Sequence, residues 1–311
     1  MRIAHLSDLH LLDLEGAVPL RLLNKRLTGY LNLRLHRRSV HRASAAQAVA
    51  REIRRRGVDH VVITGDVTNL SLEAEFQLVR TFLDDHLGLP ADRVSLVPGN
   101  HDVYTEGARR DDRFARFFGP FLHGDVDLGA ILGLPQREAS FPYVRLRGPV
   151  AIVGLSTATP RLPLVASGEI GDAQLQMLAR ILELPELQGR LPVILQHHPW
   201  HNPPSRAKAF LEGLADARRE QDVLRRVARG LLLHGHLHRR IHRTLPTHAG
   251  YLDAVGATSA SLLHDSDERM AGFNLYDVAD DLSVSISSAR LVLEPGTERA
   301  SSFRDVPVPR A

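Results

Sequence analysis

The sequence predicts an α/β fold in which parallel strands alternate with crossover helices. Two observations lead to this prediction. Short runs rich in β-branched residues alternate with longer segments in which apolar residues recur at helical spacing. This strand–helix–strand order predicts parallel strands covered by helices. The 311 residues suffice for one large domain or two small ones, and 43% hydrophobic with 24% charged residues is ordinary for a globular chain.

The first hundred residues supply strands and helices in strict alternation. Residues 42–56 predict a helix because Ala45, Val49 and Ile53 recur at helical spacing. The run 59–64 is β-branched and typical of a buried parallel strand. Ser71 is expected to cap a helix that ends near residue 87. The apolar runs 2–7 and 94–97 complete the strands expected in this part.

The remaining chain continues the alternation and then changes character. Strands at 146–147 and 150–155 flank the turn signal Gly148-Pro149. A helix is expected over 173–184, a strand over 192–196, a helix over 211–229 and a strand over 231–233. Beyond residue 240, three short antiparallel strands are expected at 251–260, 271–279 and 282–293.

The expected organisation is one domain over residues 1–294. A basic amphipathic insertion at 17–42 and an irregular, cap-like insertion at 104–140 interrupt it, and 156–168 also reads as irregular. Residues 295–311, rich in Pro, Arg and Ser, predict a loosely ordered C-terminal tail.

Composition excludes several classes of function. With no cysteine, the chain has no disulfide framework, no cysteine zinc site and no thiol nucleophile. No apolar run approaches the roughly 18 residues of a membrane span, and Asp8 and His10 interrupt the first apolar stretch, so we expect a cytoplasmic protein. A formal charge of only +3 makes no strong case for nucleic acid. The 17 histidines are the unusual number, because histidine is the commonest transition-metal ligand.

Metal-competent side chains follow the apolar runs. Five clusters do so: Asp8 with His10, 65–66, 99–102, 196–198 and 234–238. In open α/β sheets, ligands bind beyond the carboxyl ends of the strands. Residues two apart on an extended segment project to one side, so Asp8 with His10, and His236 with His238, are expected to face one point.

The donor types indicate the kind of ion. Mixed oxygen and imidazole donors suit Mn²⁺, Fe or Zn²⁺ rather than Ca²⁺. The ligands are too many for one tetrahedral ion, whereas two ions that share a bridging carboxylate about 3.5–4 Å apart would use them all.

The ordered motifs resemble a known family. The set D-x-H, GD, GNHD, H and GHxH stands here as 8–10, 65–66, 99–102, His197 and 235–238. It is similar to that of the calcineurin-like metallophosphoesterases over residues 2 to about 240. GNHD, the His-His-Pro block and the segment 272–276 look most like the class III cyclic-nucleotide phosphodiesterase branch. The resemblance implies a four-layer sandwich of two mixed β-sheets flanked by helices, and a binuclear metal centre.

The resemblance also implies a role for each motif residue. A first ligand group would hold one ion through Asp8, His10, Asp66 and His238. A second ligand group would hold the other through Asp66, Asn100, His197 and His236, so that Asp66 bridges. Asp66, Asn100 and His101 would form the catalytic set, in which a metal-bridging hydroxide attacks phosphorus and His101 stabilises charge or protonates the leaving oxygen.

The other histidines have simpler interpretations. His198 is expected to be structural, and His234 to be buried and hydrogen-bonded. Trp200 and His201 line the substrate mouth or only shape their loop. Surface positions are expected for His36, His41, His60, His86 and His264.

Two apolar features leave alternatives open. Phe114, Phe117, Phe118 and Phe121 predict helix packing into the core, with an apolar substrate groove as the alternative. No acidic residue lies between Glu15 and Glu52, and leucines interleave with basic residues there. This segment is either a solvated cover on the domain or a basic amphipathic element for an anionic membrane or ligand.

We therefore expect a binuclear phosphodiesterase that uses two divalent ions, Mn²⁺ or Fe before Zn²⁺. The branch resemblance favours a cyclic nucleotide such as 3′,5′-cyclic AMP, or another small diester. One alternative is a lipid-linked hydrolase of the UDP-2,3-diacylglucosamine type at the inner membrane surface, although the familiar form has Arg where His101 stands. A non-catalytic metal-dependent scaffold is the other, and the oligomeric state stays open.

Overall fold

The computed structural model describes residues 1–12, 41–132, 141–162 and 164–311. Its first sheet has the strand order β12-β11-β10-β1-β2-β3. These strands are β1 (Arg2–Leu6), β2 (His60–Thr64), β3 (Val94–Val97), β10 (Gly272–Val278), β11 (Val284–Leu293) and β12 (Ala300–Val306). Strands β1, β2 and β3 are parallel, and β10, β11 and β12 add antiparallel beside β1.

The second sheet has the order β4-β5-β6-β7-β9-β8. Its strands are β4 (Tyr143–Arg147), β5 (Val150–Gly154), β6 (Leu191–Leu195), β7 (Arg229–His234), β8 (Ile241–Pro246) and β9 (Tyr251–Gly256). Strands β5, β6, β7 and β9 are parallel, whereas β4 and β8 pair antiparallel at the two edges. Both sheets are therefore mixed.

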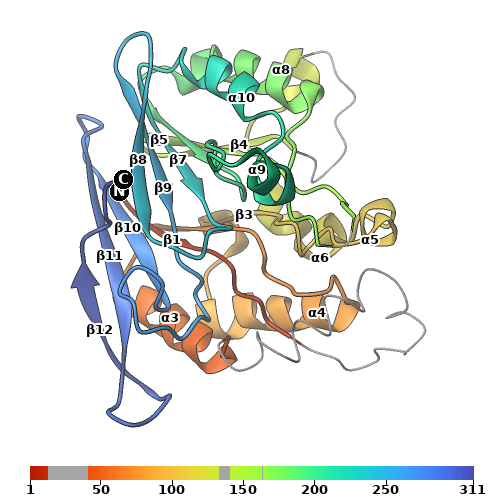
Figure 1. Ribbon diagram of the computed structural model, residues 1–311. Helices are drawn as coiled ribbons and strands as arrows, with labels where there is room; N and C mark the ends of the chain where they lie inside the picture. Colours follow the sequence, from red (N-terminus) through yellow and green to blue (C-terminus); the bar gives the residue numbers. More distant parts are fainter. Residues whose placement is uncertain (13–40, 133–140, 163) are drawn as a thin grey trace.

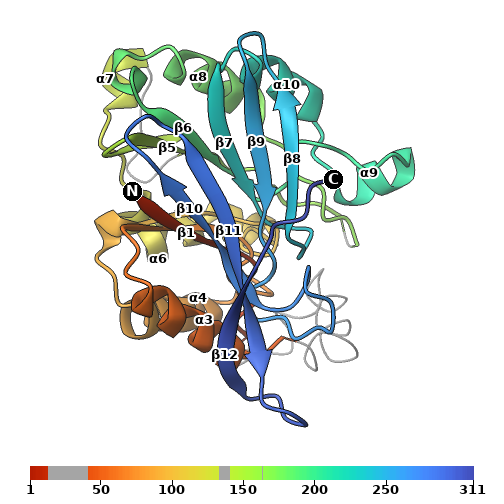
Figure 2. The ribbon, with the colours of Figure 1, turned by 90° about the vertical axis from the view of Figure 1, so that its left-hand side faces the viewer.

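Helices cover the outer faces of the two sheets (Figures 1 and 2). The first sheet carries α3 (Ala43–Arg55), α4 (Glu73–Thr81) and α6 (Arg113–Leu122), while α8 (Asp172–Ile181) and α10 (Ala217–Leu224) cover the second. Buried residues from the facing sheets, such as Ile3 and Leu195, share one core. The predicted α/β sandwich of two mixed sheets flanked by helices is confirmed.

The start of helix α4 is hydrogen-bonded to the loop that contains His101. It continues into the π-helical turn η2 (Phe82–Leu87), so the expected end near residue 87 is correct. Ser71 is not the cap: the Glu75 carboxylate accepts the Leu70 and Leu72 amides at 2.9 and 3.0 Å. Ser71 instead donates its hydroxyl to the His101 carbonyl at 2.7 Å and so ties the helix start to the GNHD loop.

The prediction of an irregular insertion at 104–140 is wrong. Residues 104–140 contain α5 (Glu106–Arg110), α6 and α7 (Leu128–Leu132), although 133–140 lie outside the described residues. Phe114, Phe118 and Phe121 of α6 are buried, which confirms core packing over an apolar groove.

The expected loose tail is also wrong. Within 295–311, β12 pairs with β11. The His242 amide donates to the Pro309 carbonyl at 2.8 Å, and the His242 carbonyl accepts the Ala311 amide at 3.0 Å. Pairing with an edge strand satisfies the backbone of a segment whose Pro, Arg and Ser composition gives no strand signal.

Several element boundaries also differ. The predicted helix 211–229 is two helices, α9 (Arg206–Glu212) and α10, because Gly213 is extended and Leu214 donates its amide to Asn202 at 2.7 Å. Strand β8 was not predicted; β9 pairs antiparallel with β8, as expected for this segment, but parallel with β7. His60 is not on the surface but fully buried, with Nε2 2.9 Å from Ser95 Oγ.

The basic insertion predicted at 17–42 lies outside the described residues except for His41 and Arg42. Within the described part of the chain, none of the helices combines the length and apolar character needed to cross a bilayer.

Candidate metal centre

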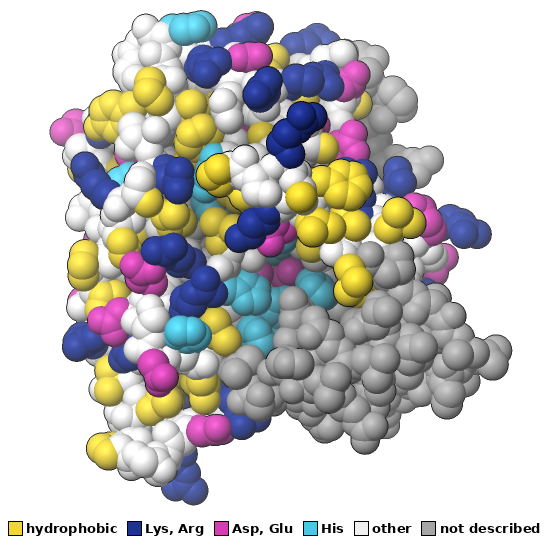
Figure 3. Space-filling view, viewed as in Figure 1, with side chains coloured by type: hydrophobic (Ala, Val, Ile, Leu, Met, Phe, Trp, Pro, Cys, Tyr) yellow, Lys and Arg dark blue, Asp and Glu magenta, His cyan; other side chains and the backbone are white. Residues whose placement is uncertain are grey.

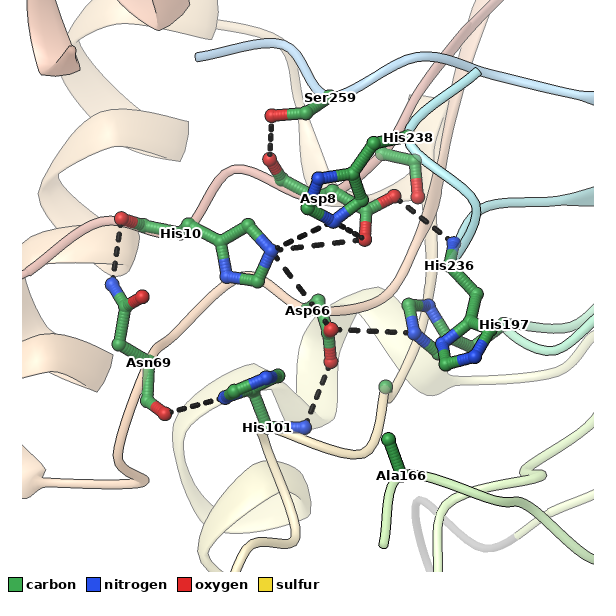
Figure 4. Close-up of polar contacts among 12 residues, drawn as sticks. Asp8, His10, Asp66, Asn69, His101, Ala166, His197, His236, His238 and Ser259 are labelled. Carbon is green, nitrogen blue, oxygen red and sulfur yellow. Dashed lines mark hydrogen bonds and ion pairs between the residues drawn. The ribbon is translucent and has the colours of Figure 1, made fainter. Parts of the chain in front are cut away.

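The predicted ligands gather at the carboxyl ends of five strands drawn from both sheets (Figure 4). Asp8 and His10 follow β1, Asp66 follows β2, Asn100 and His101 follow β3, His197 follows β6, and His236 and His238 follow β7. Histidine side chains gather in a hollow on the surface at this place (Figure 3).

The backbone turns abruptly at these positions. Five of the predicted ligands have left-handed φ angles: Asp8 at 53°, His10 at 45°, Asp66 at 50°, His236 at 67° and His238 at 48°. Such conformations are unfavourable for residues with a Cβ and are concentrated at functional sites. The Asp8–His10 and His236–His238 pairs therefore converge through tight turns, and not through the alternation of an extended strand that the sequence suggested.

Two glycines make room for the carboxylates. A Cβ at Gly99 would overlap Asp66 Oδ1 and lie 2.8 Å from Asp66 Cγ. A Cβ at Gly235 would overlap Ser7 Oγ and lie 2.6 Å from Asp8 Oδ2. Only glycine lets these loops approach the carboxylates so closely.

The first ligand group is compact. His238 Nε2 lies 3.1 Å from Asp8 Oδ1 and 3.1 Å from His10 Nε2. His10 Nε2 lies 3.8 Å from Asp8 Oδ1 and 4.0 Å from Asp66 Oδ2. Two imidazoles and two carboxylates thus surround one point.

Asp66 also belongs to the second ligand group. Its Oδ2 lies 3.3 Å from His197 Nε2, and ligand atoms of Asp8, Asp66 and His197 all lie within 4.8 Å of one another. The His236 ring centroid is 5.2 Å from that of His197. Asp66 therefore stands between the two groups, where a bridging ligand must be.

Backbone carbonyls fix which ring nitrogens face the centre. His197 donates Nδ1–H to the Thr64 carbonyl at 2.7 Å, and this leaves the Nε2 lone pair toward Asp66. His236 donates Nε2–H to the Glu212 carbonyl at 2.9 Å, so its Nδ1 carries the lone pair that a metal would require. This hydrogen bonding of the opposite ring nitrogen is the pattern found around metal-bound histidines.

The donor set fits two divalent ions. Asn100 Oδ1 is buried and, among the described residues, has no hydrogen-bond partner, as expected of an oxygen placed for a cation. The charges of His197 and His101 keep the pKa of Asp66 well below its usual range although burial alone would raise it. An ionised carboxylate, an amide oxygen and imidazoles form a suitable ligand set for Mn²⁺, Fe or Zn²⁺.

His101 lies beside the ligand groups and is held from both ends. Its backbone amide donates to Asp66 Oδ1 at 2.8 Å, and its Nδ1–H donates to the Asn69 carbonyl at 2.6 Å. Asn69 in turn donates its side-chain amide to the His10 carbonyl at 2.7 Å. Sequence reasoning missed Asn69, whose only signal is its place three residues after Asp66.

Asp102 completes the GNHD motif without reaching the ions. It accepts the Gly99 and Thr68 amides, each at 2.9 Å, and so closes the loop that carries Asn100 and His101. Burial and the nearby charge of Asp66 raise the pKa of Asp102 to about 7.

The predictions for His198 and His234 agree with the structure. His198 accepts from Thr157 Oγ1 and donates to the Ala166 carbonyl, both at 2.8 Å, so neither ring nitrogen faces the centre. His234 is buried with Nδ1 3.1 Å from the Gly235 carbonyl. Trp200 packs against the core of the second sheet, which favours the loop-shaping interpretation.

His41 also departs from the prediction. It was expected on the surface, yet ligand atoms of His10, His41 and His238 lie within 4.8 Å of one another. No motif marks His41 in the sequence.

Known structures share the fold. A dimetal phosphatase from Danio rerio superposes with a TM-score of 0.57 at 14% identity and covers 99% of both chains. Purple acid phosphatase PPD1 from yellow lupin (Lupinus luteus) superposes with a TM-score of 0.56 at 10% identity, and covers 100% of this chain but only 54% of the lupin chain. No curated protein matches this chain.

A family profile covers most of the sequence. The profile described as calcineurin-like phosphoesterase matches residues 1–240, the part that contains all seven predicted ligands. The chain belongs to the calcineurin-like phosphoesterase family and is a metal-dependent phosphoesterase.

Proposed function

We propose that the enzyme hydrolyses phosphodiesters with two divalent ions, Mn²⁺ or Fe before Zn²⁺, and that its substrate is a small soluble diester such as a cyclic nucleotide. The observation that carries this proposal is the placement of His101. Its backbone is fixed to Asp66, the carboxylate shared by both ligand groups, and its Nδ1 to Asn69, so the ring lies 5.2 Å from that of His10 between centroids.

Two ions held by these groups would polarise phosphoryl oxygens and lower the pKa of a water between them. The protein itself would supply the proton for the leaving group. When His101 is protonated, the Asn69 carbonyl occupies Nδ1–H and leaves the Nε2 proton for the leaving oxygen. As the bond from phosphorus to that oxygen breaks, the proton moves from Nε2 to the oxygen. An alkoxide leaving group, as in an alkyl diester, needs this proton most.

A substrate panel with Mn²⁺ tests the proposal. It contains bis(p-nitrophenyl) phosphate, p-nitrophenyl phosphate, cyclic AMP and a glycerophosphodiester. The diesters are expected to be hydrolysed faster than the monoester. Preference for the monoester, or normal metal binding with no diester turnover, would contradict the proposal, and the second outcome would favour a scaffold.

A lipid-linked diester is the second candidate, and one observation favours it. Four large apolar side chains are exposed: Leu162 by 73%, Leu164 by 80%, Phe210 by 68% and Leu211 by 43%. The two segments that carry them are linked to each other and to the metal centre. The Leu211 carbonyl accepts the Ala166 amide at 2.7 Å, and the carbonyl of the next residue, Glu212, accepts His236 Nε2–H. Hydrophobic side chains border the hollow that contains the histidines (Figure 3).

This candidate predicts that the exposed apolar side chains affect turnover of a lipid-linked substrate only. Replacing Phe210 and Leu211 by Ser is expected to lower kcat/KM on a UDP-diacyl sugar but not on bis(p-nitrophenyl) phosphate. Tyr251→Ser is the matched control, because Tyr251 is 50% exposed on β9. If the double variant has equal effects on both substrates, or none, the apolar rim does not bind acyl chains.

Under this candidate we also propose peripheral contact of the basic segment 17–42 with anionic membranes. Each basic residue near such a surface contributes about 1 kcal/mol, and the contact weakens with salt. Pelleting with anionic but not neutral vesicles at low salt is expected, and Gln at Arg34, Arg37 and Arg38 should reduce it. Indifference to anionic vesicles would favour the soluble diester.

A further inference from the structure

His41 is anchored to the segment that also supports Asp8. It forms an antiparallel β-bridge with Leu262, and the next amide, Arg42, donates to the Ser261 carbonyl at 2.8 Å. Ser259 of the same segment donates its hydroxyl to the Asp8 carbonyl at 2.6 Å (Figure 4). The backbone therefore fixes His41 relative to the first ligand group.

A chain of hydroxyls supports the Nδ1–H tautomer of His41. A carbonyl only accepts, so the Ser259 proton points to Asp8. Ser261 Oγ, 3.2 Å from Ser259 Oγ, can then donate to it. In that arrangement, Ser261 Oγ accepts at 2.8 Å from His41 Nδ1–H. In the neutral ring, Nε2 then carries the lone pair that a metal requires.

The ring lies close enough to share an ion with its neighbours. Its centroid is 4.8 Å from that of His10 and 5.5 Å from that of His238, and the three residues offer ligand atoms within 4.8 Å of one another. Two imidazoles bound to one ion at about 2.0–2.1 Å each have nitrogens about 3–4 Å apart. The ligand atoms, now within 4.8 Å of one another, must draw together to this range for His41 to enter the same shell.

We propose that His41 is a further ligand of the ion held by Asp8, His10, Asp66 and His238. The inference rests on the binuclear centre of the proposed function. Its third imidazole would favour Fe, Co²⁺ or Zn²⁺ at this position over ions that prefer only oxygen ligands. The orientation of His41 by Ser261 corresponds to the outer hydrogen bonds that orient metal-bound histidines elsewhere.

Metal binding, and not turnover, is the decisive measurement. Purified His41→Ala, Ser261→Ala and His86→Ala are titrated with Co²⁺, followed by visible absorbance and by the rate of release to EDTA. His86 is the matched control, because it is a half-buried imidazole on η2 that contacts Phe82. Circular dichroism of the metal-free proteins verifies that each variant folds.

In His41→Ala, the affinity for one of the two ions is expected to fall at least 10-fold, with faster release and a changed cobalt spectrum. Loss of an outer hydrogen bond typically costs 10–100-fold in affinity, so Ser261→Ala should show a smaller fall in the same ion, and it decides the matter if His41→Ala does not fold. His86→Ala should match the wild type.

Wild-type affinity and release for both ions in His41→Ala would overturn the proposal. So would reduced turnover with unchanged metal affinity, because His41 would then act on the substrate. If the wild type binds two ions but hydrolyses no diester, the proposed function fails while the assignment of His41 stands.

Discussion

Replacing His101 by Ala separates metal binding from proton transfer. The backbone amide of residue 101 keeps its 2.8 Å bond to Asp66 Oδ1, and Asn69 keeps its 2.7 Å bond to the His10 carbonyl. The variant loses the 2.6 Å bond from Nδ1 to Asn69 and the stacking on Tyr104. A lost hydrogen bond of this kind costs about 1 kcal/mol of stability, so fold and metal content should survive.

Turnover should fall far more. A positioned acid contributes about 10²–10⁴-fold, which corresponds to roughly 3–5 kcal/mol of activation free energy. Nitrophenolate leaves without much protonation, whereas an alkoxide does not. The loss should therefore be larger on an alkyl diester than on bis(p-nitrophenyl) phosphate.

The assay compares kcat on both esters at equal metal occupancy. His101→Gln is the matched variant, because its amide can still donate to Asn69 but gives up no proton, and it should behave as His101→Ala does. Equal losses on the two esters would show charge stabilisation instead of proton transfer. Unchanged turnover would remove His101 from the mechanism.

Two further predictions follow from packing and burial. Gly99→Ala places a Cβ against Asp66, so both ions should bind more weakly in metal analysis, and full occupancy would refute the close approach. Burial raises the pKa of Glu220 from 4.5 to about 8, so the stability of the neutral buried acid is complete below about pH 4.5 and is lost as pH rises through 8. Glu220→Gln should therefore increase the free energy of unfolding relative to wild type at pH 8, by up to a few kcal/mol, but not at pH 4.5. A higher melting temperature at pH 8 alone would show this. A difference independent of pH would contradict this.

The gathering of the candidate metal ligands could be predicted because each is part of a local motif at a strand end. Strands such as 60–64 are signalled by their own β-branched residues, and the turn that follows carries the ligand. The left-handed turns at Asp8 and His10 could not be predicted, because Asp and His adopt positive φ angles more often than most residues but still only in a small minority of cases. The prediction that Asp8 and His10 face one point was thus correct, but the strand alternation offered as its reason was wrong.

Long-range pairing explains the other failures. Strand β12 exists because β11 offers an edge, and β9 is parallel because β7 is its neighbour. Neither partner is visible in the sequence of the strand itself. His41 entered the site in the same way, through its bridge with Leu262, 221 positions further along the chain.

The central claim is that Asp66 is shared by two ions. Its Oδ2 lies 3.3 Å from His197 Nε2 and 4.0 Å from His10 Nε2, in different ligand groups. Metal analysis of purified wild type, Asp66→Ala and His238→Ala, all confirmed to be folded, tests this claim most directly. The wild type should hold two ions per chain, Asp66→Ala should lose both, and His238→Ala should weaken one. Two ions bound at full occupancy in Asp66→Ala would contradict the account.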